Sequence, residues 1–246
     1  MRKALAFLTP FGGAAVPTAG TLDWFPVVGA AIGLAVGAVW WLAVRAWSPV
    51  GAAGIVVVSD IVLTGYLHLD GLADSADGLL PPMTSERRLE VMADPSVGAF
   101  GAVTLIAVLL LRFGAFASAA PAPLVIGALW CGSRTAMAVV ARCGHYARPG
   151  GLATAFVDAR GGVAAGRQRP LAGAVVPGLV GTVLALTLAI AGRGTHGLAA
   201  LAGELVGITA VVLFARKRIG GFTGDVLGAA GVVGETIGLV VLAAKW

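Results

Sequence analysis

Seven stretches of about 20 mostly apolar residues constrain the fold of this chain more than any other feature. They cover residues 27–45, 49–69, 99–119, 123–142, 171–191, 196–215 and 225–244. In helical form, each matches the roughly 30 Å thickness of a bilayer's hydrocarbon core. Charged residues make up only 12% of the 246 residues, against about 25% in a typical soluble domain. We therefore predict an all-α, polytopic helical membrane bundle of about seven transmembrane helices, forming a single integral membrane domain over residues 1–246.

The basic residues predict how this bundle lies in the lipid bilayer. The connections around 46–48, 120–122 and 192–195 are short, whereas those at 70–98, 143–170 and 216–224 are longer and polar. Twelve of the 17 Lys and Arg residues lie at the N-terminus or in and beside the long connections. Cytoplasmic loops are enriched in basic residues, so we predict a cytoplasmic N-terminus and three cytoplasmic loops. This topology accounts for most of the basic residues and for the net charge of +5 without a nucleic-acid partner.

Three aspartates stand close together in a chain that has only 12 acidic residues. Asp70, Asp74 and Asp77 follow His68 in the string HLDGLADSADG. Spacings of four and three place their carboxylates on one face if the segment is helical, and like charges at that spacing repel. Mg²⁺ prefers such oxygen ligands and would neutralise them. The cluster therefore predicts a metal or metal-phosphate site, with a solvated acidic turn as the alternative.

Two further acidic groups extend this prediction. Glu90 and Asp94 are four residues apart in the same connection, where surface ion pairs are the competing explanation. Asp225 follows a glycine-rich stretch at the start of the last apolar run. Backbone N–H groups at a helix start suit a phosphate, and an acid beside it can hold a cation. The phosphate-binding candidates in this stretch are Gly221, Thr223 and Gly224, although the glycines are also explained by tight packing.

Five ionisable residues fall within the predicted spans. They are Asp60, Arg112, Arg134, Glu204 and Glu235. Charged groups are costly in hydrocarbon, so such residues face the bundle interior and are either paired or functional. For Asp60, Arg112 and Glu204, a structural ion-pair network and a catalytic role are equally compatible with the sequence.

Several blocks of the sequence together resemble the cobalamin synthase (adenosylcobinamide-GDP ribazoletransferase) family. HLDGLAD at 68–74, with Asp77 and Gly78, is similar to the family's signature. Further similar blocks are FPVVG at 25–29, RLEVM at 88–92 with Asp94 and GAFG at 98–101, Arg134 with YARPGG at 146–151, and GGFTGDVLGA at 220–229. The stretch 8–11 matches the family's start imperfectly, which leaves the role of that region open.

The resemblance implies a membrane phosphotransferase. A hydroxyl of α-ribazole, or of its 5′-phosphate, would attack adenosylcobinamide-GDP, release GMP and form adenosylcobalamin or its 5′-phosphate, with Mg²⁺ as cofactor. On this reading Asp70, Asp74 and Asp77 bind the metal and activate the nucleophile, and Glu90, Asp94 and Asp225 complete the metal-binding set. Arg88, Arg134 and Arg148 would contact phosphate. His68 is either a base or a group that holds a carboxylate in place.

The composition also predicts where the protein is located. The alanine-, glycine- and arginine-rich composition is typical of a GC-rich bacterial genome, so we expect a multi-pass protein of the bacterial cytoplasmic (inner) membrane, with its active site facing the cytoplasm. A homo-oligomer is compatible with the sequence. The alternatives are a CDP-alcohol-type phosphotransferase, a membrane prenyltransferase and, from another class, a secondary transporter that uses the intramembrane charges.

Overall fold

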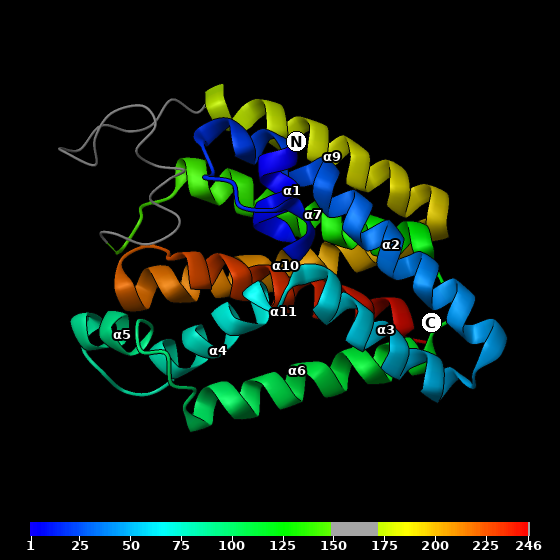
Figure 1. Ribbon diagram of the computed structural model, residues 1–246, viewed down its shortest axis with the longest axis horizontal. Coiled ribbons are helices and arrows are strands. Elements are labelled where there is room, and N and C mark those ends of the chain that lie inside the picture. The colour runs from blue at the N-terminus through cyan, green and yellow to red at the C-terminus, as the bar shows by residue number, and fades with distance from the viewer. Residues whose placement is uncertain (149–171, 246) are drawn as a thin grey trace.

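The computed structural model describes residues 1–148 and 172–245, and their regular structure is entirely helical (Figure 1). The α-helices are α1 (Arg2–Leu8), α2 (Phe25–Ala46), α3 (Pro49–Thr64), α4 (Leu67–Leu79), α5 (Ser85–Val91), α6 (Ala99–Ser118), α7 (Pro123–Cys143), α9 (Ala172–Arg193), α10 (Thr195–Ile219) and α11 (Gly224–Ala243). Two 3₁₀ helices, η1 (Pro10–Gly12) and η2 (Ala19–Trp24), lie between α1 and α2. Six of these helices are long and apolar enough to cross a membrane, and a seventh span results if α3 and α4 count as one broken span. The prediction of an all-α, multi-span bundle is confirmed.

The long and short connections lie at opposite ends of the bundle. Figure 1 shows the turns from α2 to α3, α6 to α7 and α9 to α10 at the right-hand end, with the C-terminus. The α4–α6 connection, the end of α7 and the α10–α11 turn lie at the left-hand end. This arrangement agrees with the predicted grouping of the connections. Residues 149–170, most of the predicted 143–170 loop, lie outside the described part of the chain.

The predicted straight span over residues 49–69 is wrong. Helix α3 ends at Thr64, and α4 leaves it at an angle of 91°. Gly65 and Tyr66 both adopt the left-handed conformation, with φ of 61° and 64°. That conformation costs a non-glycine residue such as Tyr66 about 1–2 kcal/mol, so the packing around the break must hold it there.

The break also changes the predicted 70–98 loop. Residues 70–79 belong to α4, and α5 follows after a short turn. The aspartate cluster is therefore helical, as its spacing suggested, but it lies on a bundle helix that packs against α6 and α11. The connection from 216 to 224 is also shorter than predicted, because α10 continues to Ile219.

Helix α7 forms the centre of the bundle and packs most closely against α2. Gly29, Gly33 and Gly37 recur every fourth residue along α2, and a Cβ atom on any of them would lie 2.4–2.6 Å from an α7 backbone atom. Small residues at this spacing let two membrane helices approach until their backbones touch. Trp130 of α7 is fully buried in the resulting core.

Candidate functional site

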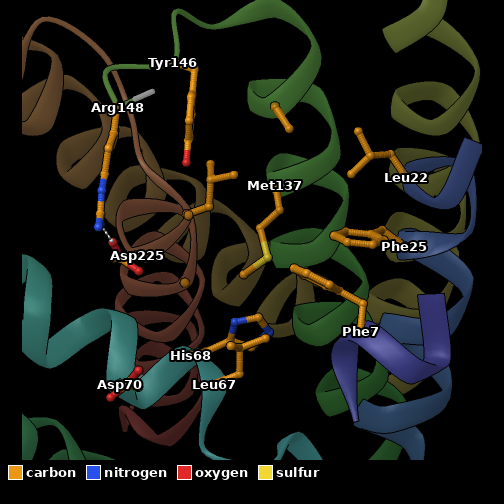
Figure 2. Close-up of a pocket in the computed structure, with 14 residues that line it drawn as sticks. Phe7, Leu22, Phe25, Leu67, His68, Asp70, Met137, Tyr146, Arg148 and Asp225 are labelled. Atoms are coloured by element: carbon orange, nitrogen blue, oxygen red, sulfur yellow. Dashed lines mark ion pairs between the residues drawn. The ribbon is translucent and has the colours of Figure 1, made fainter. Parts of the chain in front are cut away.

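A cavity of about 260 Å³ lies where α1, α2, α4, α7 and the start of α11 meet (Figure 2). Five of the residues selected from the sequence line it: His68, Asp70, Arg148, Gly224 and Asp225. They come from three regions that are far apart in the chain. The cavity therefore brings the aspartate cluster and the glycine-rich block together, as the prediction of one site requires.

The acids of α4 and α11 meet because the two helices are in close contact. A Cβ atom at Gly71 would lie 2.9 Å from both Cα and the carbonyl oxygen of Asp225, so only glycine fits here. Thr223 is the N-cap of α11: its hydroxyl accepts a hydrogen bond from Val226 N at 3.2 Å and donates to Asp225 at 3.2 Å. Asp74 lies where the negative charges of Asp70, Asp225 and Asp77 all act on it. The result is a concentration of negative charge at one end of the cavity.

Two residues after α7 complete this polar end. Arg148 lies 4.0 Å from a carboxylate oxygen of Asp225 and is about one-third exposed. Tyr146 packs edge-on against Phe222, with ring centroids 5.5 Å apart, and its hydroxyl points toward the cavity in Figure 2. Burial raises the pKa of Tyr146, and the charge of Asp225 raises it further. Tyr146 is therefore a neutral hydrogen-bond donor at neutral pH.

His68 lies between the polar end and an apolar end of the same cavity. His68 is only 6% exposed, and its Nε2 atom has no hydrogen-bond partner among the described residues. Leaving a buried polar atom unpaired costs about 1–3 kcal/mol. Nε2 does not orient a carboxylate, which was one of the two predicted roles.

Asp77 differs from the other two aspartates of the cluster. Its carboxylate is buried and accepts hydrogen bonds from Gly98 N at 2.7 Å and from Gly101 N at 2.9 Å. These N–H groups belong to the first turn of α6, where an anion is favourable and the donors have no helical partner. Asp77 thus has a structural explanation as the cap of α6, and its role as a metal ligand stays a prediction.

Arg88 has a comparable structural role at the C-terminal end of α4. Its guanidinium is buried and donates to the carbonyl oxygens of Gly78 at 2.7 Å and Leu79 at 2.8 Å. These are C-terminal carbonyls of α4, which lack partners within the helix. The structure places Arg88 outside the cavity lining, so it gives the predicted phosphate contact no support.

Glu90 and Asp94 are exposed and do not line the cavity. Glu90 accepts a hydrogen bond from Arg87 at 2.8 Å, with both side chains 64% exposed. Asp94 accepts from Ser96 N at 2.9 Å in a local turn. Surface interactions account for both acids, and their place in the metal-binding set stays a prediction that the geometry does not favour.

The intramembrane charges form a buried ion-pair network. Arg112 pairs with Asp60 at 2.5 Å and with Glu235 at 2.7 Å, and Arg134 pairs with the second oxygen of Glu235. Trp130 Nε1 also donates to Asp60, at 3.2 Å. The structural alternative is confirmed for Asp60 and Arg112. The network also contains Arg134, so the structure does not bring that predicted phosphate ligand to the cavity.

Glu204 lies close to this network without an ion pair of its own among the described residues. It is 2% exposed, and its Oε1 atom has no hydrogen-bond partner there. A Cβ atom on Gly132 would lie 2.5 Å from its other oxygen. Glycine at 132 therefore makes room for this carboxylate against α7.

The glycine-rich block has mixed roles. A Cβ atom on Gly221 would lie 2.2 Å from the carbonyl oxygen of His145, because residues 145–147 and 222 pair through backbone hydrogen bonds of 2.9 Å. Gly221 and Thr223 thus hold the loop and cap the helix, whereas Gly224 alone of the three lines the cavity. The first turn of α11 is the part of this block that a phosphate can approach.

The residues at the polar end suit Mg²⁺. Asp70, Asp74 and Asp225 offer hard carboxylate oxygens, and their mutual repulsion would be relieved by a cation. Among the described residues, no three His, Cys, Asp or Glu side chains are already arranged around one metal position. Mg²⁺ commonly uses one or two carboxylates together with waters and substrate phosphates, so a complete protein cage is not required.

Sequence reasoning missed the apolar wall of the cavity. Phe7 of α1, Leu22 of η2, Phe25 of α2 and Met137 of α7 line it, and Phe7 stacks on Phe25 with ring centroids 5.8 Å apart. Residues 8–11, whose role was left open, do not line the cavity, whereas Phe7 directly before them does. Phe25 and Tyr146 lay within the blocks that resemble the family, whereas nothing in the sequence marked Phe7.

Fold and site together define a multi-pass helical membrane protein with an acidic cavity suited to phosphate chemistry. The family model described as Cobalamin-5-phosphate synthase matches residues 1–243. The chain therefore belongs to the cobalamin-5-phosphate synthase family.

Curated relatives agree with this family. Proteins named adenosylcobinamide-GDP ribazoletransferase are 38% identical in Bradyrhizobium diazoefficiens, over 99% of this chain and 93% of the relative, and 37% identical in Chlorobaculum tepidum, over 92% and 86%. The protein of that name in Citrobacter koseri is 36% identical over 89% of this chain and 85% of its own length. No solved structure gives a significant match.

Proposed function

We propose that this protein performs the final step of nucleotide-loop assembly in cobalamin biosynthesis. It transfers the corrinoid phosphate of adenosylcobinamide-GDP to a hydroxyl of α-ribazole or α-ribazole 5′-phosphate. The observation that carries the proposal is the cavity in which neighbouring carboxylates of α4 and α11 meet a helix N-terminus. Family membership and the names of the relatives support the choice of substrates.

The transfer breaks one bond and forms one bond at the same phosphorus. The hydroxyl oxygen of the acceptor attacks the phosphorus nearer the corrinoid, and the bond from that phosphorus to the oxygen bridging to GMP breaks. GMP leaves with the bridging oxygen, and the hydroxyl proton passes to a carboxylate of the polar end. Phosphoryl transfer requires mainly positioning and neutralisation of charge, which Arg148 and the first turn of α11 supply here.

We further propose that Asp70, Asp74 and Asp225 hold Mg²⁺. When bound, Mg²⁺ neutralises phosphate charge and stabilises both the attacking and the leaving oxygens. Asp77 is left out of this set because both of its oxygens already accept hydrogen bonds from α6. The assignment rests on Asp70 and Asp225, which line the cavity, and on Asp74, on which the charges of both act.

The basic residues also support an orientation of the protein in the membrane. The basic bias of the sequence supports a multi-pass protein of the bacterial inner membrane whose cavity end faces the cytoplasm. Figure 1 shows the α4–α6 connection, the end of α7 and the α10–α11 turn together at one end of the bundle, where soluble nucleotide substrates would have to enter. A transporter is less well supported, because four of the five intramembrane charges, all except Glu204, are paired with one another.

The test is GMP release by the purified protein in liposomes. With adenosylcobinamide-GDP, α-ribazole and Mg²⁺ all present, we expect one GMP for each cobalamin formed. Omission of any one of the three should stop release. GMP release without α-ribazole would indicate a hydrolase instead, and accumulation of substrate inside sealed vesicles without GMP release would indicate a transporter.

A further inference from the structure

The cavity has two chemically different ends. In Figure 2, Asp70, Arg148 and Asp225 lie on one side, and the side chains of Phe7, Leu22 and Phe25 lie on the other. His68 and Met137 lie between them. A ligand that fills this space must therefore be apolar at one end and polar or anionic at the other.

The volume limits what can bind. Small-molecule pockets usually measure about 300–1,000 Å³, and this cavity measures about 260 Å³. It is large enough for a single nucleoside and far too small for a corrin macrocycle. The corrinoid must therefore lie outside it.

The lining of the apolar end distinguishes the two bases in the reaction. Phe7, Leu22, Phe25, Leu67 and Met137 offer no side-chain donor or acceptor to a ring edge. Guanine carries polar groups around its rim, and burying them here would leave them unpaired at a substantial cost. The base of α-ribazole is a benzimidazole with two methyl groups, so all of its rim except one ring nitrogen is apolar and needs no partner.

His68 gives an independent indication that a ligand lies between the two ends. Its imidazole lines the cavity, and its buried Nε2 atom has no partner among the described residues. A nucleoside whose base fills the apolar end would place its glycosidic region at this position. Its ribose would then extend toward Asp70 and Asp225, where the reacting hydroxyl is required.

From these observations, and resting on the proposed function, we infer that this cavity is the acceptor subsite. The apolar end holds the benzimidazole base between Phe7, Phe25 and Met137, and the imidazole of His68 contacts the nucleoside. Phe7 and His68 are positioning residues, and the N-terminal helix α1 forms part of the acceptor subsite. The guanosine part of the donor binds elsewhere.

The test compares two residues of α1, one whose side chain lines the cavity and one whose side chain does not. Phe7 lines the cavity, whereas Leu5 is 40% exposed and does not line it. Loss of an aromatic contact with the base should raise the KM for α-ribazole about tenfold in Phe7→Ala. The KM for adenosylcobinamide-GDP should stay within about twofold of wild type, and Leu5→Ala should leave both values unchanged. Calorimetric titration of α-ribazole alone should show the same tenfold weakening in Phe7→Ala.

A second variant tests the same contact through a change in specificity, which misfolding would not produce. Phe7→Trp adds volume to the apolar end, so it should shift the preference from the dimethylated base toward an unsubstituted benzimidazole nucleoside by about tenfold in kcat/KM. An increase in the donor KM alone, or unchanged acceptor binding and base preference in both variants, would overturn the inference while leaving the proposed function intact. Absence of GMP release by the wild-type protein would instead overturn the proposed function and this inference with it.

Discussion

This apolar protein holds two groups of charged residues. In the part of the chain that the structure describes, the positive and negative charges of one group balance, and those of the other do not. In the buried network, two arginines pair with two carboxylates, Asp60 and Glu235. Among the described residues, Asp70, Asp74 and Asp225 have one arginine near them, Arg148. In a balanced group, every charge finds its partner within the fold. An unbalanced acidic group bordering a cavity leaves charge for a ligand, which is how the two can be told apart.

The largest expected effect is on stability and concerns the network. Arg112→Met would leave Asp60 and Glu235 buried without their shared partner, which typically costs about 3–5 kcal/mol. We expect a large fall in the denaturation midpoint of the detergent-solubilised protein. Arg87→Met, which breaks only an exposed pair, is the control and should change the midpoint little. An Arg112→Met protein as stable as wild type would show that the network is not a structural element.

The next effect is on activity and concerns the cavity acids. Asp225→Asn keeps the shape of the side chain and removes its charge, so GMP release should fall by about 100-fold or more. The denaturation midpoint should change little, since one of several repelling carboxylates has been neutralised. Activity close to wild type would remove Asp225 from the site.

A variant of Asp77 distinguishes its role as the cap of α6 from a role as a metal ligand. Asp77→Asn puts an amide group against one of the two α6 N–H donors, so we expect a loss of about 1–3 kcal/mol in the free energy of unfolding. The Mg²⁺ concentration for half-maximal GMP release should stay within about twofold of wild type, since the metal ligands remain. A tenfold higher Mg²⁺ requirement would return Asp77 to the metal site.

The smallest effect is expected at Glu90. Because this acid lies on the surface in a pair with Arg87, Glu90→Gln should change both kcat and the Mg²⁺ requirement by less than about twofold. The same steady-state assay of GMP release measures both. A strong loss of activity would mean that α5 moves to the cavity during the reaction.

The helices were predictable because apolar runs of membrane length have few alternative structures. The break at Gly65 and Tyr66 was not, since the apolar run continues through it and nothing in the sequence marks Tyr66 for a left-handed conformation. The same limit applies to the site. The sequence identified Asp77, Arg88 and Arg134 as charges in suggestive places, but it could not show that α6, α4 and Glu235 already satisfy them.

The apolar half of the cavity was hidden for a related reason. Phe7 is one of many apolar residues in this chain, and its role depends on how α1 folds back against α2. By contrast, Asp70, Asp74 and Asp225 were identifiable because acids are rare here and because their motifs resembled a family. Rare residue types carry information in a membrane sequence, whereas common ones acquire a role only in three dimensions.

The most direct test of the central claim is a Mg²⁺ titration of GMP release with Asp74→Asn beside the wild-type protein. Asp74 is the acid on which the charges of Asp70, Asp77 and Asp225 converge. If these unbalanced acids hold the metal at the reacting phosphate, the variant should fold normally, lose about 100-fold or more of its activity and recover little of it at high Mg²⁺. Full activity with the normal Mg²⁺ dependence would contradict the account.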